Sequence, residues 1–242
     1  TVLKKIYLQP HFLRVTMAKD QEEIIVDVEE VYSKTEHWVV ENQKSLTIII
    51  GAIVLMMVSF FAYKNFYLQP QEVEAQEQMW QAQKAFASDS LDQALYGNDV
   101  AYGFLDIIDN YGITESANLS NYYAGISYLR LGQYEEAIQY LEDYDCSDIM
   151  VCAVALGATG DAYMELGEVD KAISYYESAF GHNANDLTTP IYLMKAARAY
   201  EEVGDYSDAL SLYSRIKQEY PNSNEGQQIE KFIARAEGLS GK

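Results

Sequence analysis

Cysteine, proline and histidine are all scarce in this sequence of 242 residues, and each shortage excludes something. Two cysteines are too few for a disulfide framework or a structural zinc ribbon. Four prolines are few for a β protein rich in turns. In contrast, 49% hydrophobic residues and 21 tyrosines suit helices that pack large aromatic side chains against small ones. We therefore expect an all-α fold.

Residues that commonly carry catalysis are isolated from one another. The three histidines, His11, His37 and His182, stand far apart, and neither a P-loop nor a G-x-G-x-x-G motif is present. The many carboxylates suit a solvated helix surface, and none forms an evident acid/base pair. We predict no catalytic, cofactor-binding or metal site and a protein that is not an enzyme. The alternative is a hydrolase on the acidic surface.

Basic residues are scarce in the larger part of the chain. The formal net charge is −20: up to Lys64, seven Lys or Arg stand against eight Asp or Glu, and from Asn65 onward ten stand against 29. Such an acidic region repels phosphate backbones, so we predict no nucleic-acid partner. Either the charge serves solubility alone, or it favours basic and unfolded cationic partners.

One segment carries no charge at all. Leu46–Tyr63 (LTIIIGAIVLMMVSFFAY) runs for 18 residues between Lys44 and Lys64. As a helix it covers roughly 27 Å, close to the hydrocarbon thickness of a bilayer. No small-x-small cleavage site follows it, so we predict a retained signal anchor at residues 46–63 that spans the lipid bilayer. The alternative is a buried core helix, although such helices usually keep a polar face.

Basic residues are more numerous before this segment than close behind it. Those before it are Lys4, Lys5, Arg14, Lys19, Lys34 and Lys44, and those close behind it are Lys64 and Lys84. The positive-inside rule then predicts a cytoplasmic N-terminus, an acidic cytoplasmic tail at residues 17–45, and the remaining chain outside the cytoplasm. Residues 1–16 hold three basic and no acidic residues before Met17. We interpret them as an extended or mis-called N-terminus.

Three later segments repeat one pattern. They are Leu131–Glu142 (LGQYEEAIQYLE), Leu166–Glu177 (LGEVDKAISYYE) and Val203–Ser214 (VGDYSDALSLYS). Their glycines, Gly132, Gly167 and Gly204, stand 35 and 37 residues apart. We expect each glycine to end a first helix in the left-handed conformation and a second helix to begin two residues later. In each second helix an alanine marks the closest approach of the pair: Ala137, Ala172 and Ala209.

The register of glycine, small and aromatic positions resembles the tetratricopeptide repeat (TPR), a helical hairpin of about 34 residues. Four places before each glycine stand Tyr128, Tyr163 and Tyr200, and seven places before it stand Gly125, Gly160 and Ala197. The resemblance implies an α-solenoid of three TPR hairpins at 118–223. A linking helix and a degenerate repeat precede them at 64–117, and a capping helix follows at 224–242. In the degenerate repeat we expect 99–114 as the second helix, with Ala101, 36 residues before Ala137, at the close approach.

TPR arrays bind extended or helical peptides along the concave face of their first helices. The matching positions are Tyr122, Ile126, Leu129, Asp161, Met164, Met194, Arg198 and Glu202; the alternative for each is an ordinary exposed helix residue. The TPR subclass that clamps a C-terminal carboxylate has Lys and Asn at such places, where this chain has Tyr122 and Ile126, and Gly157 and Asp161. Cytosolic chaperone tails are therefore not expected, and a mixed apolar and charged groove suits less specific peptide binding.

The two cysteines stand close together in the sequence. Cys146 and Cys152 are six residues apart, across the expected turn between two hairpins. Outside the cytoplasm such a pair can form a disulfide that closes a short loop. Two buried free thiols are the other alternative, and the sequence leaves both open.

The order of these elements resembles a known bacterial family. The segment EHWVVENQKS at 36–45, the apolar span, and the Gln/Ala-rich helix through Ala87 look like YfgM-type proteins, bitopic inner-membrane subunits ancillary to the Sec translocon. That resemblance implies a periplasmic TPR domain whose protein partners are the Sec translocon and periplasmic chaperones or foldases. We expect a bacterial inner-membrane TPR scaffold for such partners or for unfolded and nascent chains. The alternative is a structural subunit of an envelope secretion or assembly complex.

Overall fold

The computed structural model describes residues 37–146 and 148–241. The expectations for residues 1–16, and for the tail up to residue 36, lie outside the described residues. The chain divides into two compact units, Thr1–Ser59 and Phe60–Lys242, and each is described by itself.

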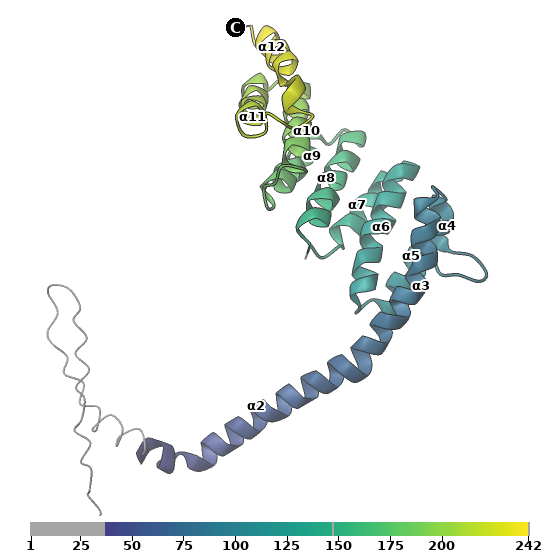
Figure 1. Cartoon of the computed structure of the whole chain (residues 1–242), viewed down its shortest axis with the longest axis vertical. Coiled ribbons are helices and arrows are strands. Elements are labelled where there is room, and N and C mark those ends of the chain that lie inside the picture. Colours follow the sequence, from purple (N-terminus) through teal and green to yellow (C-terminus); the bar gives the residue numbers. More distant parts are fainter. Residues whose placement is uncertain (1–36, 147, 242) are drawn as a thin grey trace, which may run out of the picture. The chain divides into compact units, whose positions relative to one another are not determined.

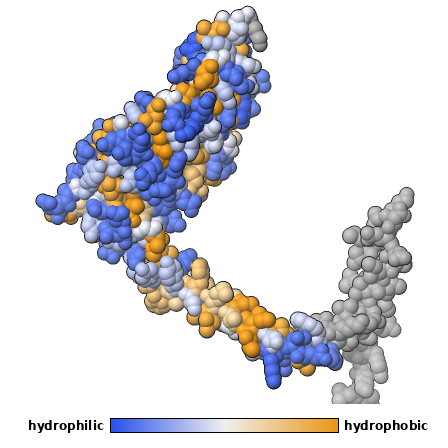
Figure 2. All heavy atoms as spheres, turned by 180° about the vertical axis from the view of Figure 1, so that it is seen from behind, coloured by the Kyte–Doolittle hydropathy of each residue, from blue (hydrophilic) through white to orange (hydrophobic). Residues whose placement is uncertain are grey.

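Helix α2 (Gln43–Tyr63) contains the predicted membrane span. None of its residues is buried against protein, and Ile48, Leu55 and Met56 are each about 70% exposed or slightly more. Hydrophobic side chains cover this helix (Figure 2). Among the described residues, one helical stretch, Gln43–Ala87, is long and apolar enough to cross a membrane, judged by length and composition. This exposure does not fit the buried-core alternative, and the membrane span itself stays a prediction.

The second unit consists of helices joined by short turns. Its elements are η1 (Lys64–Leu68, a π-helical segment), α3 (Gln69–Ala87), α4 (Leu91–Tyr96), α5 (Phe104–Tyr111), α6 (Glu115–Leu131), α7 (Tyr134–Glu142), α8 (Ile149–Glu165), α9 (Val169–Gly181), α10 (Thr189–Glu202), α11 (Tyr206–Glu219), η2 (Gly226–Gln228) and α12 (Ile229–Leu239). The described residues form no strand, only an isolated bridge between Asn98 and Ala101. Three hairpins, α6–α7, α8–α9 and α10–α11, stack in chain order (Figure 1).

The three predicted hairpin turns share one backbone geometry. Gly132, Gly167 and Gly204 have φ values of 75°, 76° and 84°, in the left-handed region that glycine adopts at little cost. In the first turn the Gln133 N–H donates to the Tyr128 carbonyl at 2.9 Å and the Gly132 N–H to the Leu129 carbonyl at 3.1 Å. The other two turns repeat both bonds. These bonds satisfy the last carbonyls of each first helix, as in a Schellman motif.

Small residues let the two helices of a hairpin approach closely, as expected. A Cβ on Gly125 would lie 3.1 Å from the Ala137 carbonyl oxygen, and one on Gly160 would lie 3.2 Å from that of Ala172. Beside these contacts the predicted tyrosines pack across the hairpin. Tyr128 stacks on Tyr140 and Tyr163 on Tyr175, each with ring centroids 5.3 Å apart. The sequence therefore predicted the internal packing of the first two hairpins correctly.

A helical hairpin, α3–α4, lies where a degenerate repeat was predicted, but the predicted register of its second helix is wrong. Ala101 lies in the isolated bridge before α5 and not in a helix. The hairpin turn instead lies at Asp89, whose φ is 59°, and the Ser90 N–H donates to the Ala85 carbonyl and the Asp89 N–H to the Phe86 carbonyl. Ala94, five residues after Asp89 and fully buried, occupies the place that Ala137 has after Gly132. Because this turn has an aspartate where the other three have a glycine, the sequence pattern did not reveal it.

The end of the solenoid is covered by the predicted capping helix. Ile229 and Ala236 of α12 are buried, and the Phe232 ring centroid lies 5.7 Å from that of Tyr213 in α11. Because a terminal repeat otherwise leaves one apolar face open to water, this helix completes the core.

Candidate binding groove

Five of the eight predicted groove residues line one open concavity of about 470 Å³. They are Leu129, Asp161, Met164, Arg198 and Glu202. The remaining lining residues are Arg130, Tyr134, Glu165, Tyr176, Lys195 and Ala199. Most of these side chains come from the first helices α6, α8 and α10, and Tyr134 and Tyr176 come from the second helices α7 and α9. The repeat register thus brings together residues up to 73 positions apart, from Leu129 to Glu202.

The other three predicted residues lie elsewhere. The prediction for Met194 is wrong, because this side chain is only 6% exposed and packs in the core with Ala197 and Tyr213. Tyr122 and Ile126 are half-buried and pack against a separate cluster that contains Leu141 and Tyr144. These two do not line the concavity.

Asp161, Tyr176 and Lys195 form a polar network among the lining residues, and of these three only Asp161 was predicted. The Tyr176 hydroxyl donates to Asp161 Oδ1 at 2.7 Å, and Lys195 Nζ lies 2.7 and 2.6 Å from the two carboxylate oxygens. Burial raises the pKa of Tyr176 above its usual value, and the neighbouring Asp161 raises it further. Lys195 stands 34 residues after Asp161, one repeat period, so the spacing itself was a usable signal for this pair.

Part of the concave face is filled by the protein itself. Gly157 stands at a groove position of α8, and a Cβ there would lie 1.9 Å from the Tyr192 ring. Tyr192 comes from α10 and is only 6% exposed. Burial raises its pKa, with a further contribution from Asp161. The missing side chain at Gly157 therefore admits Tyr192, and this stretch of the groove is not open to a ligand.

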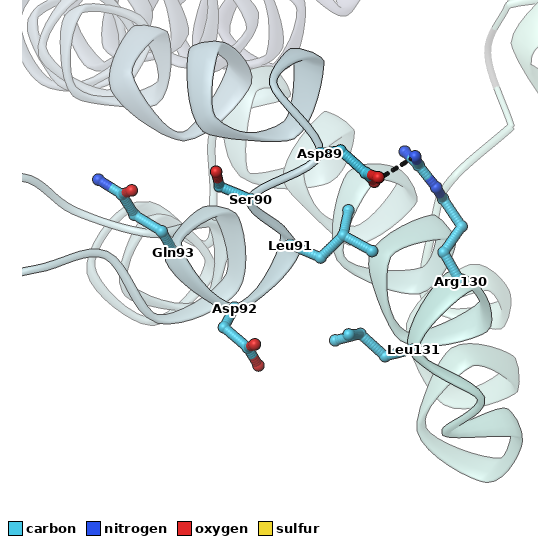
Figure 3. A pocket seen from close by; sticks show the side chains of 7 residues that line it. All are labelled: Asp89, Ser90, Leu91, Asp92, Gln93, Arg130 and Leu131. Atoms are coloured by element: carbon cyan, nitrogen blue, oxygen red, sulfur yellow. Dashed lines mark hydrogen bonds and ion pairs between the residues drawn. The ribbon is translucent and has the colours of Figure 1, made fainter.

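A second concavity lies at the turn of the degenerate hairpin (Figure 3). It measures about 600 Å³ and is lined by Asp89, Ser90, Leu91, Asp92, Gln93, Arg130 and Leu131. The Arg130 guanidinium pairs with the Asp89 carboxylate at 2.5 Å (Figure 3). The pair connects the α3–α4 turn to the end of α6. We assign the concavity no ligand.

Neither concavity contains a cluster of metal-ligating residues. Among residues 37–146 and 148–241, no group of three or more His, Cys, Asp or Glu residues is arranged to hold a metal ion. Nothing in the described part of the chain points to catalysis, and the groove offers apolar contacts, hydrogen bonds and charge.

The two cysteines lie within bonding distance. Their sulfur atoms are 2.18 Å apart and their Cα atoms 5.0 Å apart, which corresponds to a disulfide. Cys152 is buried near the start of α8, and Cys146 lies exposed in the preceding loop. Whether the bond forms in the cell depends on the redox compartment, so it stays a prediction.

Comparison with known proteins supports the repeat assignment. Family models of the tetratricopeptide repeat match residues 120–144 and 158–224. Two crystal structures of a Podosopora anserina protein assigned as a kinesin light chain, with nearly identical TPR-like repeats, share the fold at a TM-score of 0.52. Each is 16% identical to this chain, and the similarity covers 69% of this chain and 87% of the other. No curated protein matches the chain.

Proposed function

We propose that this chain, which carries tetratricopeptide repeats, is a membrane-anchored scaffold that binds segments of other proteins. One observation carries the proposal: residues from the first helices of three TPR hairpins line an open concavity. Leu129 and Met164 contribute apolar side chains to this lining. Proteins with such repeats typically act as interaction scaffolds without catalysis. The proposed anchor is α2, whose exposed apolar side chains favour lipid over water.

We further propose that the anchor lies in a bacterial inner membrane, with a cytoplasmic N-terminus and periplasmic repeats. The greater number of basic residues before residue 46 supports this orientation. The Cys146–Cys152 pair also fits an oxidising compartment. Protease added to spheroplasts tests the proposal: the repeats should be digested, and their survival would reverse the topology. Thiol alkylation of the full chain should label both cysteines only after reduction.

The proposed partners are the Sec translocon, periplasmic chaperones or foldases, and unfolded or nascent chains beside them. The YfgM-like order of tail, span and helix supports this choice. The mechanism would be avidity, because the anchor confines a weak groove to the membrane surface and raises its effective concentration for neighbours there.

In-membrane crosslinking tests the partner. A photo-crosslinking side chain would be placed at Met164 in the groove and, as a matched control, at the exposed Glu237 on α12. We expect adducts with translocon or folding-factor proteins from Met164 and not from Glu237. Adducts without any such protein would reject the Sec-associated role, and no difference between the two positions would reject the groove as the binding surface.

A structural subunit of an envelope secretion or assembly complex is the second candidate. The observation in its favour is a row of exposed apolar side chains spaced seven residues apart along η1 and α3. Phe66, Val73 and Trp80 are 85%, 47% and 61% exposed. Seven-residue spacing keeps such side chains on one side of a helix, where a fixed lateral interface can form. Crosslinks from Trp80 to an assembly component, without any from Met164, would favour this candidate.

A further inference from the structure

The charges around the groove are not evenly compensated. From Asn65 onward the chain has ten basic residues, and three of them, Arg130, Lys195 and Arg198, line this one concavity. Arg130 pairs with Asp89 and Lys195 with Asp161. The Arg198 guanidinium carbon lies 5.0 Å from the centre of the Phe232 ring of α12, a cation–π contact. Arg198 therefore keeps its charge on the Phe232 ring, whereas Arg130 and Lys195 are each neutralised by a carboxylate partner within the protein.

Two carboxylates at the same concavity have no such partner. Glu165 and Glu202 are exposed, and no described cationic group lies within 4.0 Å of either. Glu165 accepts a long hydrogen bond of 3.4 Å from the Tyr134 hydroxyl. The pKa of that hydroxyl is raised, first of all by the charge of Glu165. Glu165 and Glu202 thus stand against one unneutralised cation, Arg198, so the uncompensated charge of the concavity is negative.

Apolar side chains also line this concavity. Leu129 and Met164 are half-buried and belong to neighbouring cores, so their exposed parts are held in place. Tyr192 fills the adjoining stretch of the groove over Gly157. A ligand in the concavity therefore meets apolar side chains and carboxylates, and the stretch that Tyr192 fills is closed to it.

We infer that this concavity, as the binding site of the proposed scaffold, takes a cationic polypeptide segment whose Lys or Arg residues flank an apolar side chain. The apolar side chain contacts Leu129 and Met164, and the flanking cations pair with Glu165 and Glu202. The rest of the acidic region, with 29 Asp or Glu against ten Lys or Arg, attracts such a segment at longer range. The inference rests on the proposed function and adds the chemistry of the partner.

Peptide binding to the full chain in lipid nanodiscs tests the inference, with empty nanodiscs as the blank. The probes are short fluorescein-labelled peptides with a central Leu that is flanked by Lys, by Glu or by Gln, and anisotropy reports binding. We expect the Lys peptide to bind most tightly, with an affinity that falls as salt rises. A Glu165→Gln/Glu202→Gln double variant should bind it about fivefold more weakly, because two partly exposed ion pairs are lost.

The matched control changes the net charge equally at a distance from the groove. Glu77 of α3 and Glu237 of α12 are exposed and line neither concavity. The Glu77→Gln/Glu237→Gln variant should change the affinity less than twofold. Equal weakening in both double variants would show that overall charge and not this site binds the peptide, and would overturn the inference. Tighter binding of the Glu peptide would overturn it too, by making Arg198 the dominant group.

Failure of this inference is distinguishable from failure of the proposed function. If Met164 crosslinks its partner in membranes but the peptides show no preference for Lys, the scaffold role stands and the cationic preference is wrong. Circular dichroism and hydrogen exchange should show all the variants folded, since each replaced carboxylate is exposed.

Discussion

The α3–α5 region and the α6–α11 hairpins use the same turn but differ in the helix that comes after it. In both, a residue in the left-handed conformation ends the first helix, and backbone N–H groups of the turn bond back to that helix. After Gly132, Gly167 and Gly204 the second helix runs without interruption for 9 to 14 residues. After Asp89 it stops at Tyr96, and the chain loops through Gly97–Gly103 before α5 begins.

The difference shows which parts of the repeat carry its structure. The small residue at the close approach is kept in both regions, as Ala94 and Ala137, and both are fully buried. The glycine of the turn and the length of the second helix are not kept. The inserted loop is held by its own close contacts: a Cβ on Gly103 would lie 2.2 Å from the Leu95 carbonyl oxygen. Close helix packing is therefore the more demanding requirement.

The largest effect is expected from Gly103→Ala. The added Cβ would meet backbone atoms of Leu95 and Gly97 that cannot rotate away, so we expect a loss of about 3 kcal/mol in unfolding free energy. Urea titration of the detergent-solubilised chain measures the loss, and hydrogen exchange should place it in α4 and α5. Gly238→Ala in α12 is the control: no atom lies within 4 Å of an added Cβ, and we expect a gain of roughly 0.5–1 kcal/mol. Equal changes in unfolding free energy for Gly103→Ala and Gly238→Ala would contradict the close approach of Gly103 to Leu95.

Ala94→Leu tests whether Ala94 and Ala137 hold equivalent places. Both sites are fully buried between helices, so either substitution should cost about 2 kcal/mol through overpacking. Ala101→Leu, in the partly exposed bridge, should cost less than about 0.5 kcal/mol. The same urea titration ranks the three variants. A larger loss at Ala101 than at Ala94 would restore the register expected from the spacing of 36 residues.

Two tyrosine hydroxyls at the same repeat position sharpen the comparison within the regular hairpins. The Tyr176 hydroxyl donates to Asp161, whereas the buried Tyr213 hydroxyl makes no hydrogen bond of ordinary geometry among the described residues, and the Arg235 guanidinium acts on it only at longer range. Tyr176→Phe should therefore cost about 1 kcal/mol, and Tyr213→Phe should be neutral or stabilising. Thermal unfolding of the two variants, measured side by side, would reject this assignment if Tyr213→Phe proved the more damaging.

The smallest effect is expected at the irregular turn itself. Asp89→Gly removes the cost of roughly 1 kcal/mol for a side chain in the left-handed conformation. It also removes the exposed ion pair with Arg130, which is worth up to about 1 kcal/mol. The two changes should nearly cancel in the free energy of unfolding. The reverse substitution in a regular turn, Gly132→Asp, adds backbone strain without an ion pair and should cost about 1 kcal/mol. A large loss from Asp89→Gly in urea titration would mean that the ion pair dominates.

Most of the regular hairpins could be predicted from the sequence because their signals are local. The turn at Gly167, the start of α9 at Val169 and the close approach at Ala172 all follow from residues within one segment. The register of the degenerate hairpin could not be predicted in this way. Asp89 adopts the left-handed conformation, and the sequence pattern identified such turns by their glycine. The inserted loop also lengthens the spacing from Ala94 to Ala137 to 43 residues, so counting one repeat period back from Ala137 led to Ala101 instead.

The groove was predicted less completely, since its composition depends on contacts between repeats. Register alone grouped Leu129, Asp161 and Arg198, and these three line the same concavity. Met194 does not line the concavity, because it packs in the core against residues of α11 and α12. Likewise, the position of Gly157 suggested an open groove, whereas Tyr192 from the next repeat fills it.

By itself the sequence determined the helical hairpins, the apolar span at residues 46–63 and the uneven charge. These features depend on residue type and on spacing along one or two helices. Only the tertiary structure decided that Ala94 is the counterpart of Ala137 and that Tyr192 covers Gly157. It also decided that Glu165 and Glu202, which have no basic partner among the described residues, line one concavity with Leu129 and Met164. The physical reason is that burial and charge pairing depend on neighbours about one repeat away in the chain, and local pattern does not specify these neighbours.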